Sequence, residues 1–146
     1  MRLLTAAQVV DFATRLEEKS AGFYTRMAEA CPDRGDLFQS YSQQNSKHAK
    51  QIKEAYRYAV TDALETGFSF NLEEDDYALQ FLLEGSAGLA DRIGQAKKLE
   101  EIIVRFFRDA AAQSESLMAD ISGLFRTLAS KRMRRLTNLA ELERAS

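Results

Sequence analysis

The chain has 146 residues, of which 45% are hydrophobic and 29% are charged, an ordinary composition for a single globular domain spanning 1–146. One proline and seven glycines supply too few turn residues for an all-β sandwich or barrel. A single cysteine excludes a disulfide framework within the chain, and no apolar run reaches the roughly 18 residues of a membrane span. The net charge of −2, with both signs intermixed, gives no reason to expect a nucleic-acid partner. The first residues contain no long apolar segment, so we expect no signal peptide and a cytoplasmic protein.

The first two expected helices follow from capping and breaking signals. Thr5, with Gln8 three residues later, has the pattern of a capping box and predicts a helix start. Apolar residues then recur at helical spacing until Pro32, which lacks an amide hydrogen and ends the helix. After a short loop, the same spacing predicts a second helix over about 36–65.

A shorter helix is expected in the connection that follows. Asn71 with Glu74 three residues later again has a capping pattern, and the acidic run after Asn71 suits the positive end of a helix dipole. We therefore predict a helix over about 72–84.

The chain is helical in pattern from about 90 to 144, without proline. We place a turn at 112–116, because this stretch is the most polar and offers Ser114 or Ser116 as an N-cap. The alternative is one continuous helix of about 55 residues, which would have to exchange with a partner chain.

The two halves of the sequence resemble each other. Glu17 lies seven residues before Tyr24, and Glu100 lies seven residues before Phe107, which is an offset of 83 residues. Two similar helix pairs joined by a long crossover are typical of a four-helix bundle. The predicted fold is therefore all-α, a four-helix bundle with a short helix in its crossover.

Polar residues interrupt the apolar stripe of each long helix at a single level. Steps of three and four residues along the four stripes place the following residues inward: Glu17, Asn45, His48, Glu100, Arg132 and Arg135. A buried unpaired charge costs several kcal/mol, so each charged group needs a partner. Two glutamates and two arginines balance in formal charge, and we expect them to pair in the bundle core.

These positions resemble those of the ferritin-like superfamily, in particular its rubrerythrin-like branch. That family carries a glutamate on the first and third helices and an E-x-x-H motif on the second and fourth, and the six side chains hold a di-iron centre. Glu17 and Glu100 fall on the two single-glutamate positions. The motifs fall on 45–48, where the glutamate is asparagine, and on 132–135, where both ligands are arginine.

The resemblance implies a metal-dependent oxidoreductase that reduces peroxide or handles iron, but the departures argue against it. Arginine stays protonated and cannot ligate a metal. We therefore expect a salt-bridge cluster without a cofactor, in a non-catalytic structural or interaction module. Open alternatives are one iron or zinc ion held by Glu17, His48 and Glu100, arginines that reach solvent, and a helical adaptor unrelated to ferritins.

A homodimer is the expected assembly, without nucleic-acid or membrane partners. The second helix has apolar positions expected to be exposed, namely Ala55, Tyr58 and Val60. The chain from Ser86 onward carries a net charge of +3 and the remainder −5, which suits antiparallel self-association. With two arginines turned inward, the basic run 131–135 keeps two outward charges, too few for a nucleic-acid or anionic membrane surface.

Overall fold

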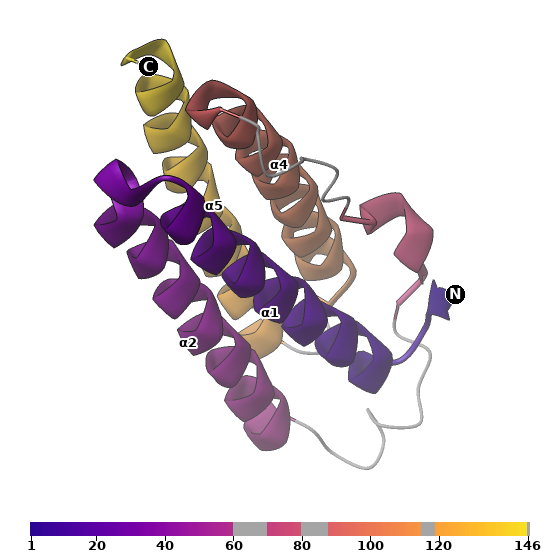
Figure 1. Ribbon diagram of the computed structural model, residues 1–146. Coiled ribbons are helices and arrows are strands. Elements are labelled where there is room, and N and C mark those ends of the chain that lie inside the picture. The colour runs from indigo at the N-terminus through magenta and orange to yellow at the C-terminus, as the bar shows by residue number, and fades with distance from the viewer. Residues whose placement is uncertain (60–69, 80–87, 115–118, 146) are drawn as a thin grey trace.

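The computed structural model describes residues 1–59, 70–79, 88–114 and 119–145. These ranges contain four long helices: α1 (Ala6–Ala30), α2 (Gly35–Ala59), α4 (Leu89–Ser114) and α5 (Ala119–Ala145). α1 pairs antiparallel with α2, α4 pairs antiparallel with α5, and the two pairs pack against each other (Figure 1). The predicted all-α four-helix bundle is confirmed.

α2 and α4 run in the same direction, so the chain between them returns along the bundle (Figure 1). The described part of this crossover holds strand β2 (Leu72–Glu73) and a short 3-10 helix, η2 (Glu74–Tyr77). β2 pairs antiparallel with β1 (Arg2–Leu3) at the start of the chain. The crossover is therefore fastened beside the beginning of α1.

The α-helix predicted over 72–84 is wrong in the part that the structure describes, and 80–84 lies outside the described residues. The backbone there is already bonded to the start of the chain, since the Glu74 amide donates to the Met1 carbonyl at 3.0 Å. The first carboxylate of the acidic run, Glu73, accepts from the Met1 ammonium group at 3.1 Å. These long-range contacts hold Leu72 and Glu73 as a strand, and the residues that follow form the short 3-10 helix η2 instead of an α-helix.

The predicted ends of α1 are confirmed. The Gln8 amide donates to the Thr5 hydroxyl at 3.2 Å, and the Thr5 amide donates to the Gln8 side chain at 3.1 Å, which completes the capping box. Pro32 opens a short 3-10 helix, η1 (Pro32–Arg34), directly after α1. α2 begins one residue before its predicted start, and 60–65 lies outside the described residues.

α4 and α5 are separate helices packed against each other, so the continuous-helix alternative is wrong. α4 remains helical through Ser114, so the predicted turn is wrong for 112–114, and its last two positions, 115–116, lie outside the described residues. Ser114 is not an N-cap, because it is buried and its hydroxyl donates to the Ala110 carbonyl at 2.8 Å within α4. Ser116, the other cap candidate, lies outside the described residues.

The inward faces of the helices meet in an apolar core rich in aromatic side chains. Phe38 is fully buried whereas its neighbour Leu37 is exposed, so the stripe of α2 runs through Phe38. The rings of Phe107 and Phe125 lie 5.5 Å apart between their centroids, and they join α4 to α5.

In the described part of the chain, no helix combines the length and apolarity needed to cross a membrane.

Candidate functional site

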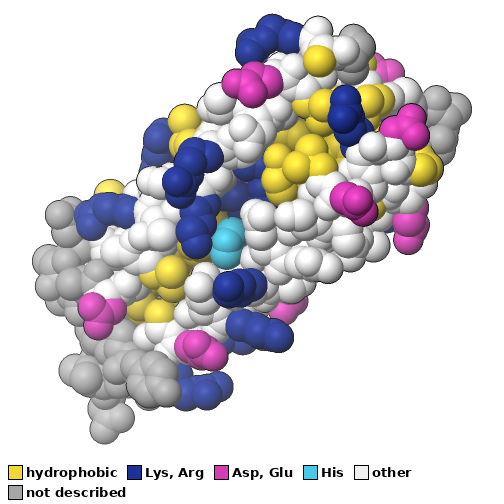
Figure 2. All heavy atoms as spheres, turned by 90° about the vertical axis from the view of Figure 1, so that its left-hand side faces the viewer, with side chains coloured by type: hydrophobic (Ala, Val, Ile, Leu, Met, Phe, Trp, Pro, Cys, Tyr) yellow, Lys and Arg dark blue, Asp and Glu magenta, His cyan; other side chains and the backbone are white. Residues whose placement is uncertain are grey.

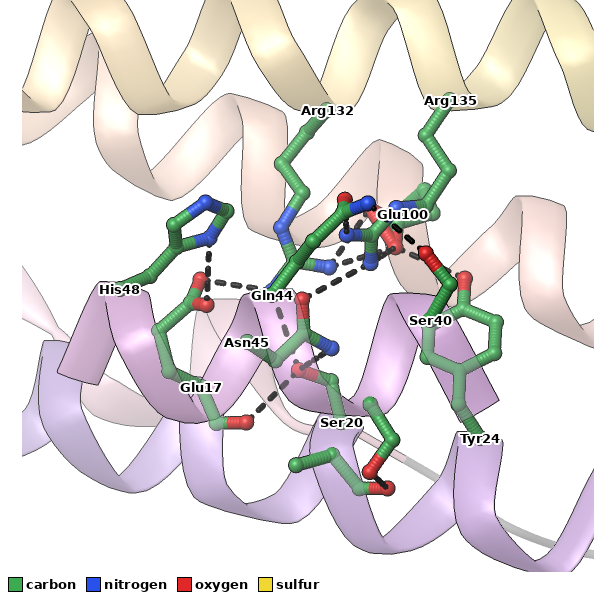
Figure 3. Close-up of polar contacts among 12 residues, drawn as sticks. Glu17, Ser20, Tyr24, Ser40, Gln44, Asn45, His48, Glu100, Arg132 and Arg135 are labelled. Atoms are coloured by element: carbon green, nitrogen blue, oxygen red, sulfur yellow. Dashed lines mark hydrogen bonds and ion pairs between the residues drawn. The ribbon is translucent and has the colours of Figure 1, made fainter. Parts of the chain in front are cut away.

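A cluster of charged and polar side chains lies at one level of the bundle core, and all four long helices contribute to it (Figure 3). The structure brings together all six residues predicted from the sequence, none more than 4% exposed: Glu17, Asn45, His48, Glu100, Arg132 and Arg135. Both arginines therefore point inward rather than to solvent.

Arg132 of α5 is the centre of the cluster. Its Nη1 donates to both carboxylate oxygens of Glu100, at 2.5 and 2.9 Å. Its Nη2 donates to Glu17 Oε1 at 2.6 Å and to the Ser20 hydroxyl at 3.0 Å. One guanidinium group thus joins a carboxylate of α1 to a carboxylate of α4, with the fork geometry that favours arginine over lysine.

Arg135 lies one turn further along α5 and shares a carboxylate with Arg132. Its Nη1 donates to Glu100 Oε1 at 3.1 Å and to Asn45 Oδ1 at 2.8 Å, and its Nη2 donates to Gln44 Oε1 at 3.0 Å. Its guanidinium carbon lies 4.4 Å from the centroid of the Tyr41 ring. Arg135 has one carboxylate partner, Glu100, and the two amide oxygens and the aromatic ring provide the rest of its stabilising contacts.

His48 and Asn45 connect α2 to α1. His48 Nδ1 lies 3.1 Å from Glu17 Oε2, and since an ionised carboxylate only accepts, this nitrogen carries the proton. Asn45 Nδ2 donates to the Ser20 hydroxyl at 2.9 Å, and that hydroxyl donates to the Glu17 carbonyl at 3.0 Å. The Asn45 side chain thus donates through its nitrogen to α1 and accepts through its oxygen from Arg135.

The charges in the cluster hold each other ionised. Burial alone would raise the pKa of Glu17, but the positive charge of Arg132 and the hydrogen bond from His48 outweigh burial and lower it. Burial alone would lower the pKa of Arg132, but the charges of Glu100 and Glu17 outweigh burial and raise it. The pairing therefore compensates the desolvation of both partners.

The sequence-based site omitted four contacting residues, Ser20, Tyr24, Tyr41 and Gln44. The Tyr24 hydroxyl donates to Glu100 Oε1 at 2.8 Å, and burial followed by the Glu100 charge raises the Tyr24 pKa well above its usual range. Ser20, Tyr24 and Tyr41 lie on the predicted inward stripes, so the same spacing signal could have included them. Gln44 lies beside the stripe of α2, and helical spacing gives no signal for it.

The donor set does not fit a di-iron centre or a single iron or zinc ion. Both oxygens of Glu100 and one of Glu17 bind Arg132, and the remaining Glu17 oxygen faces His48. An arginine between the two carboxylates repels a cation and offers it no lone pair. Across the described residues, no group of three or more His, Cys, Asp or Glu side chains could hold a metal ion.

The chain matches no protein-family model, no curated protein and no solved structure.

The hydrogen bonds within the cluster limit its chemistry. All four carboxylate oxygens of Glu17 and Glu100 accept hydrogen bonds from inside the cluster. The arrangement cross-links four helices and leaves neither carboxylate directed at a substrate.

Proposed function

We propose that the chain is a rubrerythrin-like bundle of the ferritin-like superfamily that has lost its di-iron centre and acts as a non-catalytic structural or interaction module. The observation that carries this proposal is the guanidinium group of Arg132, which bonds Glu17 and Glu100 at the same time. These two residues fall on the single-glutamate positions of the family pattern. A fixed cation of the protein takes over the role that metal ions have in joining the helices.

The charges of the substituted positions support this proposal. A site with four carboxylates and two histidines requires about four positive charges from metal ions. In this chain one motif glutamate is the neutral Asn45, and the second motif carries Arg132 and Arg135. Two carboxylates and two guanidinium groups are neutral together without any metal, so each replacement favours the same metal-free state.

Iron loading tests the proposal. Purified protein incubated anaerobically with Fe(II) and then exposed to oxygen is expected to hold well below one iron per chain and to show no iron-oxo absorption. The reason is that Arg132 and Arg135 repel the cation and occupy the carboxylates. Elemental analysis and visible absorption spectra measure the outcome. Tight stoichiometric iron binding by the unmodified chain would contradict it and favour an active oxidoreductase.

A variant that restores the family ligands is the matched control. Asn45→Glu combined with Arg132→Glu and Arg135→His provides four carboxylates and two histidines at the six positions. We expect this variant to take up about two iron ions per chain and to gain thermal stability on loading, because metal binding then stabilises the folded state. A helical variant that still fails to bind iron would contradict the ferritin-like origin.

A homodimer in the cytoplasm is the second part of the proposal, and one of its sequence arguments has to be corrected. Ala55 is not an exposed apolar position, because it is partly buried and packs against the core. The Tyr58 side chain and Val60 lie outside what the structure describes. The unequal charge of the two parts of the chain, together with the exposed side chains of Leu37 and Met133, still supports self-association.

Light scattering coupled to gel filtration measures this assembly. At about 100 μM and low salt we expect twice the chain mass of 16.5 kDa. If the charge asymmetry drives association, the mass falls toward that of the monomer in about 1 M salt, because screening shortens the reach of surface charges to a few ångströms. A monomer at low salt would contradict the dimer.

A further inference from the structure

A surface cavity of about 340 Å³ lies between α2 and α5, on the solvent side of the buried cluster. The buried side chains of His48 and Arg135 belong both to the cluster and to the lining of this cavity. The exposed lining residues include Lys47 from α2 and Lys131 and Arg134 from α5. In Figure 2 the one histidine of the chain, largely buried, is visible from the solvent side, with Lys and Arg side chains gathered around it.

The lining of the cavity is strongly cationic. Four of its residues are lysine or arginine, and none of the described residues that line it is Asp or Glu. Lys47, Lys131 and Arg134 form no ion pair with any residue that the structure describes. Positive charges around one concave site repel each other and focus a positive potential into it, which an anion would relieve.

Polar groups in the lining add hydrogen-bonding capacity. Asn138 and Gln51 carry side-chain amides in the lining, and the NH2 group of an amide can donate hydrogen bonds to an anion. The site thus combines cations that have no ion-pair partner among the described residues with neutral N–H donors.

We propose that this cavity binds a compact phosphate dianion, either inorganic phosphate or the phosphoryl group of a small phosphate ester. Arginine forks and lysine ammonium groups are the side chains that recognise phosphate oxygens. The volume is near the lower end for ligand pockets, which suits a phosphoryl group with a small substituent. The proposal goes beyond the loss of the metal centre, because Lys47, Lys131 and Arg134 are not members of the buried cluster.

Calorimetric titration at constant ionic strength tests the site, with inorganic phosphate and phenyl phosphate as the two probes. We expect saturable one-to-one binding of at least one probe, and the probe that binds more tightly identifies a free ion or an ester as the source. Lys131→Gln with Arg134→Gln is expected to weaken binding about tenfold or more, since two charge-assisted contacts are lost. Both residues are exposed, so the helical circular dichroism is expected to stay unchanged.

A control variant removes the same charge elsewhere. Lys50→Gln with Arg108→Gln changes two exposed residues that do not line the cavity, and it is expected to bind as the unmodified chain does. Absence of saturable binding for both probes overturns the proposal, as does equal weakening in both double variants. Tighter binding of a single-stranded oligonucleotide or of anionic lipid vesicles, lost in the Lys131/Arg134 variant, also overturns it, because the ligand is then a macromolecular surface.

Discussion

Replacing Arg132 with alanine is expected to lower the free energy of unfolding by about 3–5 kcal/mol. The side chain is fully buried, and its removal leaves Glu17 without its guanidinium partner and Glu100 with only Arg135 and Tyr24. A buried carboxylate without a compensating charge is far more costly than the lost attraction alone. Urea unfolding followed by circular dichroism measures the change in the free energy of unfolding. An unchanged slope of this free energy against urea concentration shows that the unfolded state is unaltered.

Two controls on the same helix separate charge from geometry. Arg134→Ala removes an exposed arginine two residues away and is expected to change stability by no more than about 0.5 kcal/mol. Arg132→Lys keeps the charge, but an ammonium group cannot reproduce the fork that reaches Glu17 and Glu100 together. We expect the lysine variant to be destabilised to an intermediate extent.

A double substitution tests whether Arg132 and Glu100 act as a pair. Arg132→Leu with Glu100→Leu removes one charge of each sign. Glu17 then keeps its contact with His48, and Arg135 keeps the amide oxygens of Asn45 and Gln44. We expect its cost to be much smaller than the sum of the two single changes, because neither single partner is left buried alone. Additive losses would show that the pair contributes no interaction energy.

The stability of the protein is expected to decrease as the pH falls below about 4.5, the ordinary pKa of a glutamate. The pKa of Glu17 is lower in the folded than in the unfolded chain, because Arg132 and His48 outweigh its burial. The unfolded chain therefore takes up the proton first. The contribution of Glu17 is fully present above the unfolded pKa and is lost as the pH falls through the folded pKa.

Urea unfolding between roughly pH 3 and pH 7 measures this dependence. Glu17→Gln removes the titrating group and is expected to flatten the acid limb of the stability curve. Glu101→Gln changes an exposed glutamate beside Glu100 and serves as the control, which we expect to keep the slope of the unmodified chain. An unchanged slope in the Glu17 variant would contradict the lowered pKa.

Much of the fold and of the cluster could be predicted from the sequence, because local rules governed them. The capping box at Thr5 and the stop at Pro32 depend only on neighbours along the chain. Helical periodicity places Glu17, Glu100 and Arg132 on inward stripes, and the cost of burying a lone charge then requires that they pair. The sequence could therefore predict this pairing before any coordinates were known.

Only the tertiary structure decided what depends on residues far apart in the chain. The segment 72–79 has a good local helix start, yet Leu72 and Glu73 pair with β1, about 70 residues away, and no local signal describes that partner. The basic run 131–135 keeps only two outward charges when it is counted alone, but α2 brings Lys47 beside Lys131 and Arg134 around one cavity. A charged pocket is a property of packed surfaces, because helices from distant parts of the sequence supply its walls.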